Sequence, residues 1–198
     1  GSTDGTVEAL KEYENVTVLQ TQLPFKTYQY PMKQYLIERF GRGRWSLYVD
    51  IDELFDYPYS EVVSLSSLLR YLNERSYTAV VAQMLDMFPE EPLSDVPSEE
   101  EEEDEPLKER YRFYDISNIR KQSYGEDPFV SGSGNVLANE EIEVYRNGIQ
   151  NSVLGNFPQL TKHPLIFFGD GVKPLVSSHG VSEARVADIT CVLFHYKF

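Results

Sequence analysis

Trp45-Ser46-Leu47-Tyr48-Val49-Asp50-Ile51-Asp52-Glu53 is an apolar run that ends in three carboxylates within four residues. The alternation over residues 47–49 predicts a buried strand that carries the acids at its end. In an extended chain, Asp50 and Asp52 point the same way, so their charges repel unless a cation or a shared proton lies between them. Hard oxygen ligands of this kind suit Mg²⁺ or Mn²⁺ carrying a diphosphate. The stretch therefore predicts a cation site at the end of a strand.

The residues before this stretch follow an α/β order. Residues 7–13 have a helical apolar pattern that Thr3, Asp4 or Thr6 would cap, and residues 16–19 are typical of a short strand. Pro31 fits the first turn of a second helix, which ends at Gly41. Apolar residues share one side of that helix: Met32, Tyr35, Leu36 and Phe40. In α/β sheets, ligands collect beyond the carboxyl ends of strands, where these carboxylates are expected to lie.

The middle of the chain adds one further candidate. Ser64 is typical of the N-cap of a leucine-rich helix, and residues 78–87 predict a continuous buried strand. Asp86 lies near the end of that strand. Because a carboxylate there is costly unless it is paired or functional, Asp86 is a second candidate for the site.

The C-terminal part contributes histidine. Residues 160–168 are a polar entry into an apolar strand, and a second apolar strand ends at His195, with Lys197 two residues on. A lone histidine is usually structural, whereas His195 at a strand end can complete a metal shell or contact a diphosphate. The Gly/Ser-rich residues 131–135 lack the Gly-Lys-Ser/Thr of a phosphate loop.

Composition limits the class of protein. At 198 residues and 41% hydrophobic content, the chain fits one domain, residues 1–198, with one core. A net charge of -14 argues against a sequence-independent nucleic-acid binder, which needs a surplus of Lys and Arg. Seven of the acids form one run, 99–105, within a proline-rich stretch, Pro89 to Pro106, that predicts a solvated loop.

Other features are expected to be absent. The single cysteine, Cys191, allows no intrachain disulfide and no cysteine-rich zinc site, and its apolar surroundings predict a buried thiol. No apolar stretch is long enough for a membrane span, and no signal peptide is visible. We expect a cytoplasmic protein, with peripheral attachment to a membrane as a second option.

Four motifs in order resemble those of glycosyltransferase family 2, in its branch of short bacterial-type domains with a Trp-x-x-x-x-Asp-x-Asp-Glu signature. They are Ser2-Thr3-Asp4-Gly5-Thr6, the stretch from Trp45 to Glu53, Leu160-Thr161-Lys162-His163-Pro164-Leu165 and Leu193-Phe194-His195-Tyr196-Lys197-Phe198. The resemblance implies a GT-A fold: a mixed α/β sheet flanked by helices, a Rossmann-like nucleotide-binding sandwich. It also implies that the first strands of that sandwich are missing, because family members have them before the Ser-Thr-Asp-Gly-Thr segment.

The resemblance implies a nucleotide-sugar donor, a glycan, lipid-linked or other hydroxyl acceptor, and Mn²⁺ or Mg²⁺ as cofactor. Donor and metal contacts carry over to Asp50 and Asp52, with His195 as a further metal ligand. Asp4 and Lys197 are further candidates for donor contacts. Two residues are assigned to catalysis: Asp86 as the candidate base, and Glu53 as a contact to donor or acceptor. Transfer in this family inverts the anomeric centre, which requires a base opposite the leaving group.

Two alternatives stay open. In haloacid-dehalogenase-like phosphatases an Asp-x-Asp also ends a buried strand, which would make Asp50 the nucleophile and Asp52 the acid. That family has a downstream Asp-Asp metal pair, which this chain lacks. The second alternative is an inactive, truncated glycosyltransferase-like interaction module with a vestigial metal site.

Overall fold

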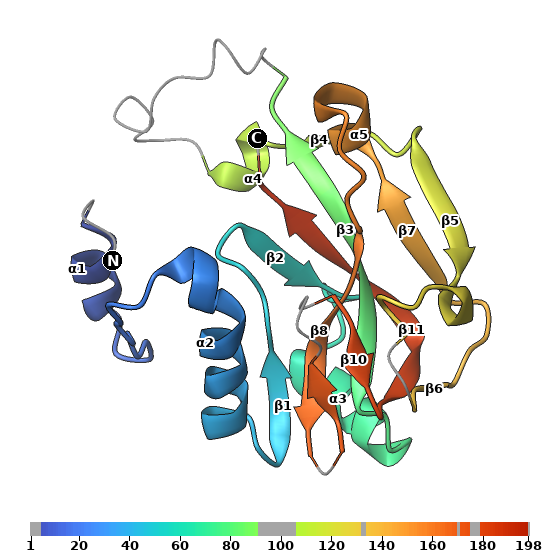
Figure 1. Cartoon of the computed structure of the whole chain (residues 1–198), viewed down its shortest axis with the longest axis horizontal. Helices are drawn as coiled ribbons and strands as arrows, with labels where there is room; N and C mark the ends of the chain where they lie inside the picture. The colour runs from blue at the N-terminus through green and yellow to red at the C-terminus, as the bar shows by residue number, and fades with distance from the viewer. Residues whose placement is uncertain (1–4, 91–105, 132–133, 170, 175–178, 198) are drawn as a thin grey trace.

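The computed structural model describes residues 5–90, 106–131, 134–169, 171–174 and 179–197. Asp4 and most of the predicted acidic loop therefore lie outside the described residues. The chain forms a mixed α/β structure in which one large sheet dominates and the helices are few (Figure 1). No helix within the described ranges has the length and apolar character needed to cross a membrane.

Seven strands form the main sheet. They are β1 (Arg44–Leu47), β2 (Glu53–Asp56), β3 (Ala79–Phe88), β4 (Phe113–Tyr114), β6 (Val136–Leu137), β8 (Thr161–Phe168) and β11 (Arg185–His195). The order is β1-β8-β3-β11-β2, with β4 paired to β3 and β6 to β11. β3 and β11 run parallel, whereas β8 and β2 run antiparallel to their neighbours. The carboxyl ends of β3 and β11 and the first residue of β2 therefore meet at one edge.

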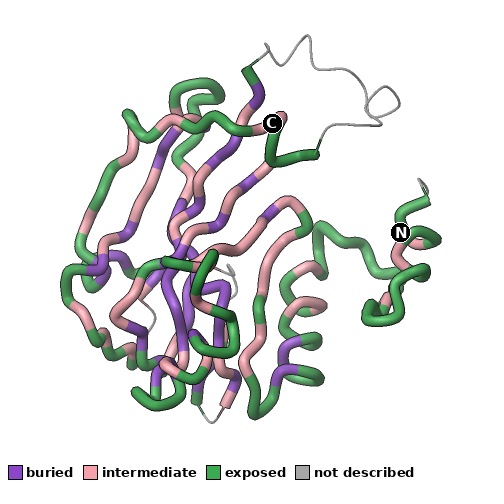
Figure 2. The backbone as a smooth tube through the Cα atoms, turned by 180° about the vertical axis from the view of Figure 1, so that it is seen from behind, coloured by how far each residue is buried: buried purple, intermediate pink, exposed green. Residues whose placement is uncertain are grey.

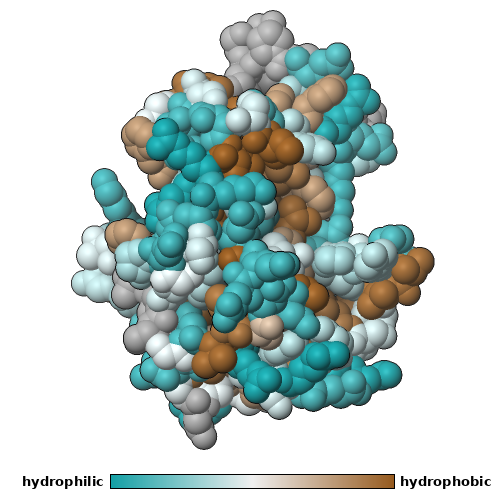
Figure 3. Space-filling model, turned by 90° about the vertical axis from the view of Figure 1, so that its right-hand side faces the viewer, coloured by the Kyte–Doolittle hydropathy of each residue, from teal (hydrophilic) through white to brown (hydrophobic). Residues whose placement is uncertain are grey.

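Two further pairs of strands and a short helical turn cover part of this sheet. β5 (Ile119–Ser123) pairs with β7 (Glu143–Asn147), and β9 (Lys173–Pro174) pairs with β10 (Val181–Ser182). The 3₁₀ turn η2 spans Tyr124–Glu126. Hydrophobic surface lies among hydrophilic areas on the side that carries β5, β7 and α5 (Ile149–Leu154), where Ile116, Val153 and Phe157 are exposed (Figure 3).

The central strands β3 and β8 are buried on both faces, as the core of Figure 2 shows. Successive residues of β3 alternate between two clusters. Val80 and Ala82 pack with Leu68 and Leu72 of α3 (Leu65–Glu74), whereas Val81 packs on the opposite face beside η2 and β7. The N-cap prediction is confirmed, because the Ser64 side chain accepts a hydrogen bond from the Ser67 N–H. Cys191 is buried as predicted, and burial raises the pKa of its thiol to about 12.

The predicted single strand over the opening stretch is wrong. β1 ends at Leu47, residues 48–52 form a link with a turn closed by the Glu53 N–H and the Asp50 carbonyl (3.1 Å), and Glu53 starts β2. β1 and β2 are the outer strands of the sheet, yet the six Cα–Cα steps from Leu47 to Glu53 span at most about 20 Å. Four strand spacings are about 19 Å, and the turn over residues 50–53 shortens the link below that length, so the sheet must curl to be joined there.

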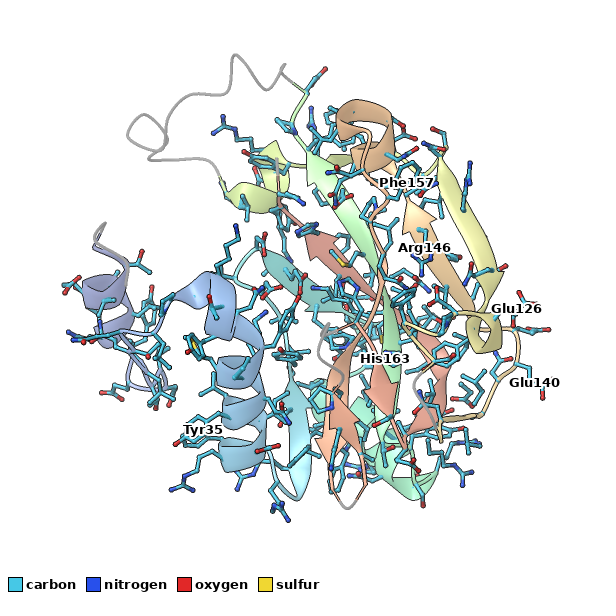
Figure 4. All side chains as sticks on the ribbon, in the orientation of Figure 1. Tyr35, Glu126, Glu140, Arg146, Phe157 and His163 are labelled. Carbon is cyan, nitrogen blue, oxygen red and sulfur yellow. The ribbon has the colours of Figure 1, made fainter. Side chains whose placement is uncertain are left out.

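The N-terminal elements differ from the sequence predictions in their boundaries. α1 spans Thr6–Lys11 and begins at Gly5 without a side-chain cap, and residues 16–19 form no strand. α2 spans Phe25–Phe40, so Pro31 lies inside the helix, although Gly41 ends it as predicted. Only Ile37 of α2 is buried, and Tyr35 points away from the sheet (Figure 4). α4 (Leu107–Arg110) follows the part of the chain that is not described.

Candidate functional site

The register of the sheet places three predicted site residues in one row. His195, the last residue of β11, is opposite Glu53 on β2 and opposite Asp86 on β3. All three side chains are buried, with 4 to 7% of each residue exposed. Asp52 approaches from the link before β2, and its carbonyl accepts a hydrogen bond from the Tyr196 N–H (2.9 Å). Four of the site residues expected from the sequence therefore lie together: Asp52, Glu53, Asp86 and His195.

His195 lies between two carboxylates. Its Nδ1 is 2.6 Å from Asp86 Oδ1 and its Nε2 is 3.3 Å from Asp52 Oδ2. An ionised carboxylate only accepts hydrogen bonds, so the contact with Asp86 places a proton on Nδ1. The Nε2 lone pair then faces a carboxylate oxygen, and this arrangement is favourable only with a positive charge between them. A proton on Nε2 or a metal ion supplies that charge.

One ligand atom each from Asp52, Glu53 and His195 lies within 4.8 Å of the other two. Ligand atoms around a bound Mn²⁺ or Mg²⁺ are about 3 Å apart, so these side chains would have to move closer together to hold an ion. Two carboxylates and an imidazole suit Mn²⁺ better than Mg²⁺, because Mg²⁺ prefers oxygen ligands in near-ideal octahedral geometry. These residues fit a divalent cation.

Asp50 has a different environment from Asp52. Its Oδ1 accepts a hydrogen bond from Lys33 of α2, and its Oδ2 is 3.4 Å from Lys162 Nζ on β8. Partial burial alone would raise the pKa of Asp50, but the two lysines outweigh it and lower that pKa. The structure therefore does not place Asp50 and Asp52 on one shared cation, and a metal-ligand role for Asp50 stays a prediction.

Lys162 joins the two parts of the cluster. This lysine is 5% exposed and also donates to Glu53 Oε1, while Glu53 Oε2 accepts from the Asp50 N–H (3.1 Å). A buried ammonium is costly without anionic partners, and here it has two. His179 lies close enough to be affected by the charge of Lys162; burial first, and then Lys162, lower the pKa of His179 to about 4.

Three residues of this cluster had no role predicted from the sequence: Lys33, Gln150 and Lys162. Lys162 could have been identified from the sequence, because a lysine within an apolar strand needs an anionic partner. Lys33 on a helix surface and Gln150 on a short helix had no such signal. Gln150 donates to both oxygens of Asp86, at 3.0 Å each, and accepts from Lys197 at 2.9 Å. Lys197 thus belongs to the cluster through Gln150.

No protein-family model, no curated protein and no solved structure matches the chain. Any functional assignment therefore has to be argued from the sequence and from the geometry of this cluster.

Proposed function

We propose that this chain is a metal-dependent glycosyltransferase that moves a sugar from a nucleotide-sugar donor to a hydroxyl acceptor with inversion, on a GT-A-like fold. The observation that carries the proposal is the pairing of His195 Nε2 with Asp52 Oδ2 at 3.3 Å, beside Glu53, which favours a cation. This cluster lies at the carboxyl end of β11 and close to that of the parallel strand β3, and ligands of α/β sheets collect near such strand ends. The sequence motifs of the family supply the reaction class.

Asp52, Glu53 and His195 would hold Mn²⁺, with Mg²⁺ as the weaker alternative. The ion supplies charge that stabilises the departing nucleoside diphosphate. Lys33 and Lys162 keep Asp50 ionised and bring two further positive charges beside it, which favours the binding of an anionic donor.

Asp86 is a weaker candidate for the base than the sequence indicates. It is 5% exposed, and Gln150 and His195 already donate to its oxygens. An acceptor hydroxyl needs a carboxylate within hydrogen-bond reach that is free to take its proton. The contacts of Asp86 favour holding His195.

The phosphatase alternative has less support. It requires Asp50 to follow a buried strand, but β1 is an edge strand with a half-exposed pattern. It also requires a free carboxylate nucleophile, and both oxygens of Asp50 contact lysines.

Thermal melting with Mn²⁺ or Mg²⁺, with and without a panel of nucleoside diphosphates, tests the proposal. We expect Mn²⁺ with a diphosphate to raise the melting temperature most, because a ligand at 100 times its Kd stabilises by about 2.7 kcal/mol. Asp52→Asn should abolish the rise. A matched control is Asp188→Asn, since Asp188 accepts from Tyr71 at 2.7 Å on a different part of the sheet.

The activity itself is tested by hydrolysis of sugar nucleotides with Mn²⁺. Release of a nucleoside diphosphate that depends on Asp52 supports a transferase. Phosphate release from p-nitrophenyl phosphate that depends on Asp50 would support the phosphatase instead. An unchanged melting curve at millimolar metal and nucleotide would favour the interaction module.

A further inference from the structure

A chain of polar contacts runs inward from Lys197 to the candidate metal ligands. Lys197 Nζ is 2.9 Å from Gln150 Oε1, Gln150 Nε2 is 3.0 Å from each oxygen of Asp86, and Asp86 Oδ1 is 2.6 Å from His195 Nδ1. Gln150 is 3% exposed. None of these contacts is between residues adjacent in sequence, so the chain of contacts exists only in the folded protein.

The chemistry of its ends fixes the direction of every hydrogen bond. A lysine ammonium only donates, so Gln150 must turn its carbonyl oxygen to Lys197 and its amide nitrogen to Asp86. Asp86 then accepts from Gln150 on both oxygens and from the imidazole on one. His195 is left with its proton on Nδ1 and with Nε2 directed at Asp52.

The backbone before Gln150 is held in an unusual conformation. Asn147 and Gly148 have consecutive positive φ angles, 77° and 65°, immediately before α5 begins at Ile149. A non-glycine residue in this region is strained, and such strain persists where the surrounding structure enforces it. Asn147 also has a buried side-chain nitrogen without a hydrogen-bond partner. This turn sets the position at which α5 presents Gln150 to Asp86.

We propose that Gln150 and Asp86 are positioning residues that orient the His195 imidazole for cation binding. This inference rests on the metal site of the proposed function. Partners that hold the second nitrogen of a metal-binding histidine fix its tautomer and ring orientation, and their loss typically weakens metal affinity 10- to 100-fold. Asp86 acts on the imidazole directly, and Gln150 acts on it through Asp86.

The test measures the affinity for Mn²⁺ alone, from the electron paramagnetic resonance signal of the free ion. Gln150→Leu and Asp86→Asn should each raise the Kd for Mn²⁺ about 10- to 100-fold. Asn151→Ala is the matched control on the same helix, because Asn151 bonds Asn118 and Asn156 and lies outside the chain of contacts. Its Kd should equal that of the wild type.

A double-mutant test separates positioning from a general loss of structure. In a His195→Ala background, neither Gln150→Leu nor Asp86→Asn should weaken Mn²⁺ binding further, since both act through the imidazole. Equal Kd values for Gln150→Leu and Asn151→Ala, or an additional loss in the His195→Ala background, would overturn the inference. If Asp86→Asn does not fold, Gln150→Leu provides the same comparison.

The outcomes also distinguish this inference from the proposed function. If the wild type does not bind Mn²⁺, both are refuted. If it binds Mn²⁺ through His195 but hydrolyses no sugar nucleotide, the glycosyltransferase is refuted and the positioning role stands.

Discussion

Two aspartates of this protein, Asp86 and Asp127, are both buried, but their hydrogen-bond partners differ in kind. Asp127 is fully buried; its Oδ2 accepts from Arg146 (2.6 and 3.0 Å) and Gln122 (2.9 Å), and its Oδ1 from the N–H groups of Phe129 and Val130. Arg146, labelled in Figure 4, comes from β7. The N–H groups close the turn after Asp127, and Gln122 and Arg146 tie that turn to β5 and β7.

Asp86, in contrast, accepts a hydrogen bond from His195, whose ring has a second nitrogen. By holding Nδ1, Asp86 fixes the orientation of the ring and so directs Nε2 at Asp52, 3.3 Å away. A buried carboxylate is therefore a weak indicator of function, because burial requires only that its oxygens be satisfied. The kind of partner is the better indicator of function. A guanidinium and backbone N–H groups stabilise a loop, whereas an imidazole can also hold a cation.

The largest expected effect is on stability and comes from replacing Asp127. Asp127→Ala should lower the free energy of unfolding by about 3–5 kcal/mol, because it leaves Arg146 without its buried partner. Urea denaturation measures this loss. The Kd for Mn²⁺ of the folded protein should not change; a tenfold change would show that Asp127 also supports the site.

The histidines extend the comparison. His195 has a carboxylate at each nitrogen, whereas His163 has the Tyr124 hydroxyl (2.8 Å) and the His179 carbonyl (2.7 Å). Burial lowers the pKa of His163 to about 4, below the value of about 6.5 expected in the unfolded chain. The unfolded state then binds the proton more readily. Stability from this group is full above pH 6.5 and falls as pH decreases toward 4.

That loss amounts to about 3 kcal/mol for His163, at about 1.4 kcal/mol per pH unit. Urea denaturation from pH 7 to pH 4 measures it. His163→Gln should flatten this part of the profile, and the remaining slope should include His179, whose pKa is also lowered. An unchanged slope in His163→Gln would show that His163 is not neutral in the folded protein.

A smaller effect concerns Lys162, which donates to Glu53 and would compete with a metal ion for that carboxylate. Lys162→Met should lower the melting temperature in EDTA, because it leaves Glu53 buried without its partner. The same variant should bind Mn²⁺ about tenfold more tightly, since a nearby positive charge has been removed. Weaker Mn²⁺ binding would instead make Lys162 a support of the metal site.

The smallest effect is expected on the surface and serves as the control for Lys162. Lys121 pairs with Glu143 at 3.3 Å, and the side chains are 52 and 43% exposed. Lys121→Met should leave the free energy of unfolding at the wild-type value within error, because solvent screens exposed pairs. The Kd for Mn²⁺ should stay at the wild-type value.

The sequence predicted features correctly where they depend on neighbouring residues alone. Continuous apolar runs predicted β3, β8 and β11, and the cost of burying a carboxylate singled out Asp86. The same approach failed at residues 48–52, because local alternation cannot show that the chain leaves the sheet edge and turns. Gln150 was missed because its contact with Asp86, 64 residues away, has no local signature.

By itself, the sequence determined which side chains can provide charge: Asp50, Asp52 and Glu53 in one stretch, and Asp86 and His195 near the ends of two strands. Only the tertiary structure decided which charges meet. The parallel register of β3 and β11 brings Asp86 to His195, while α2 and β8 supply the lysines that hold Asp50. The physical reason is that electrostatic interactions depend on distance in space, and strand register and the 48–52 link set those distances.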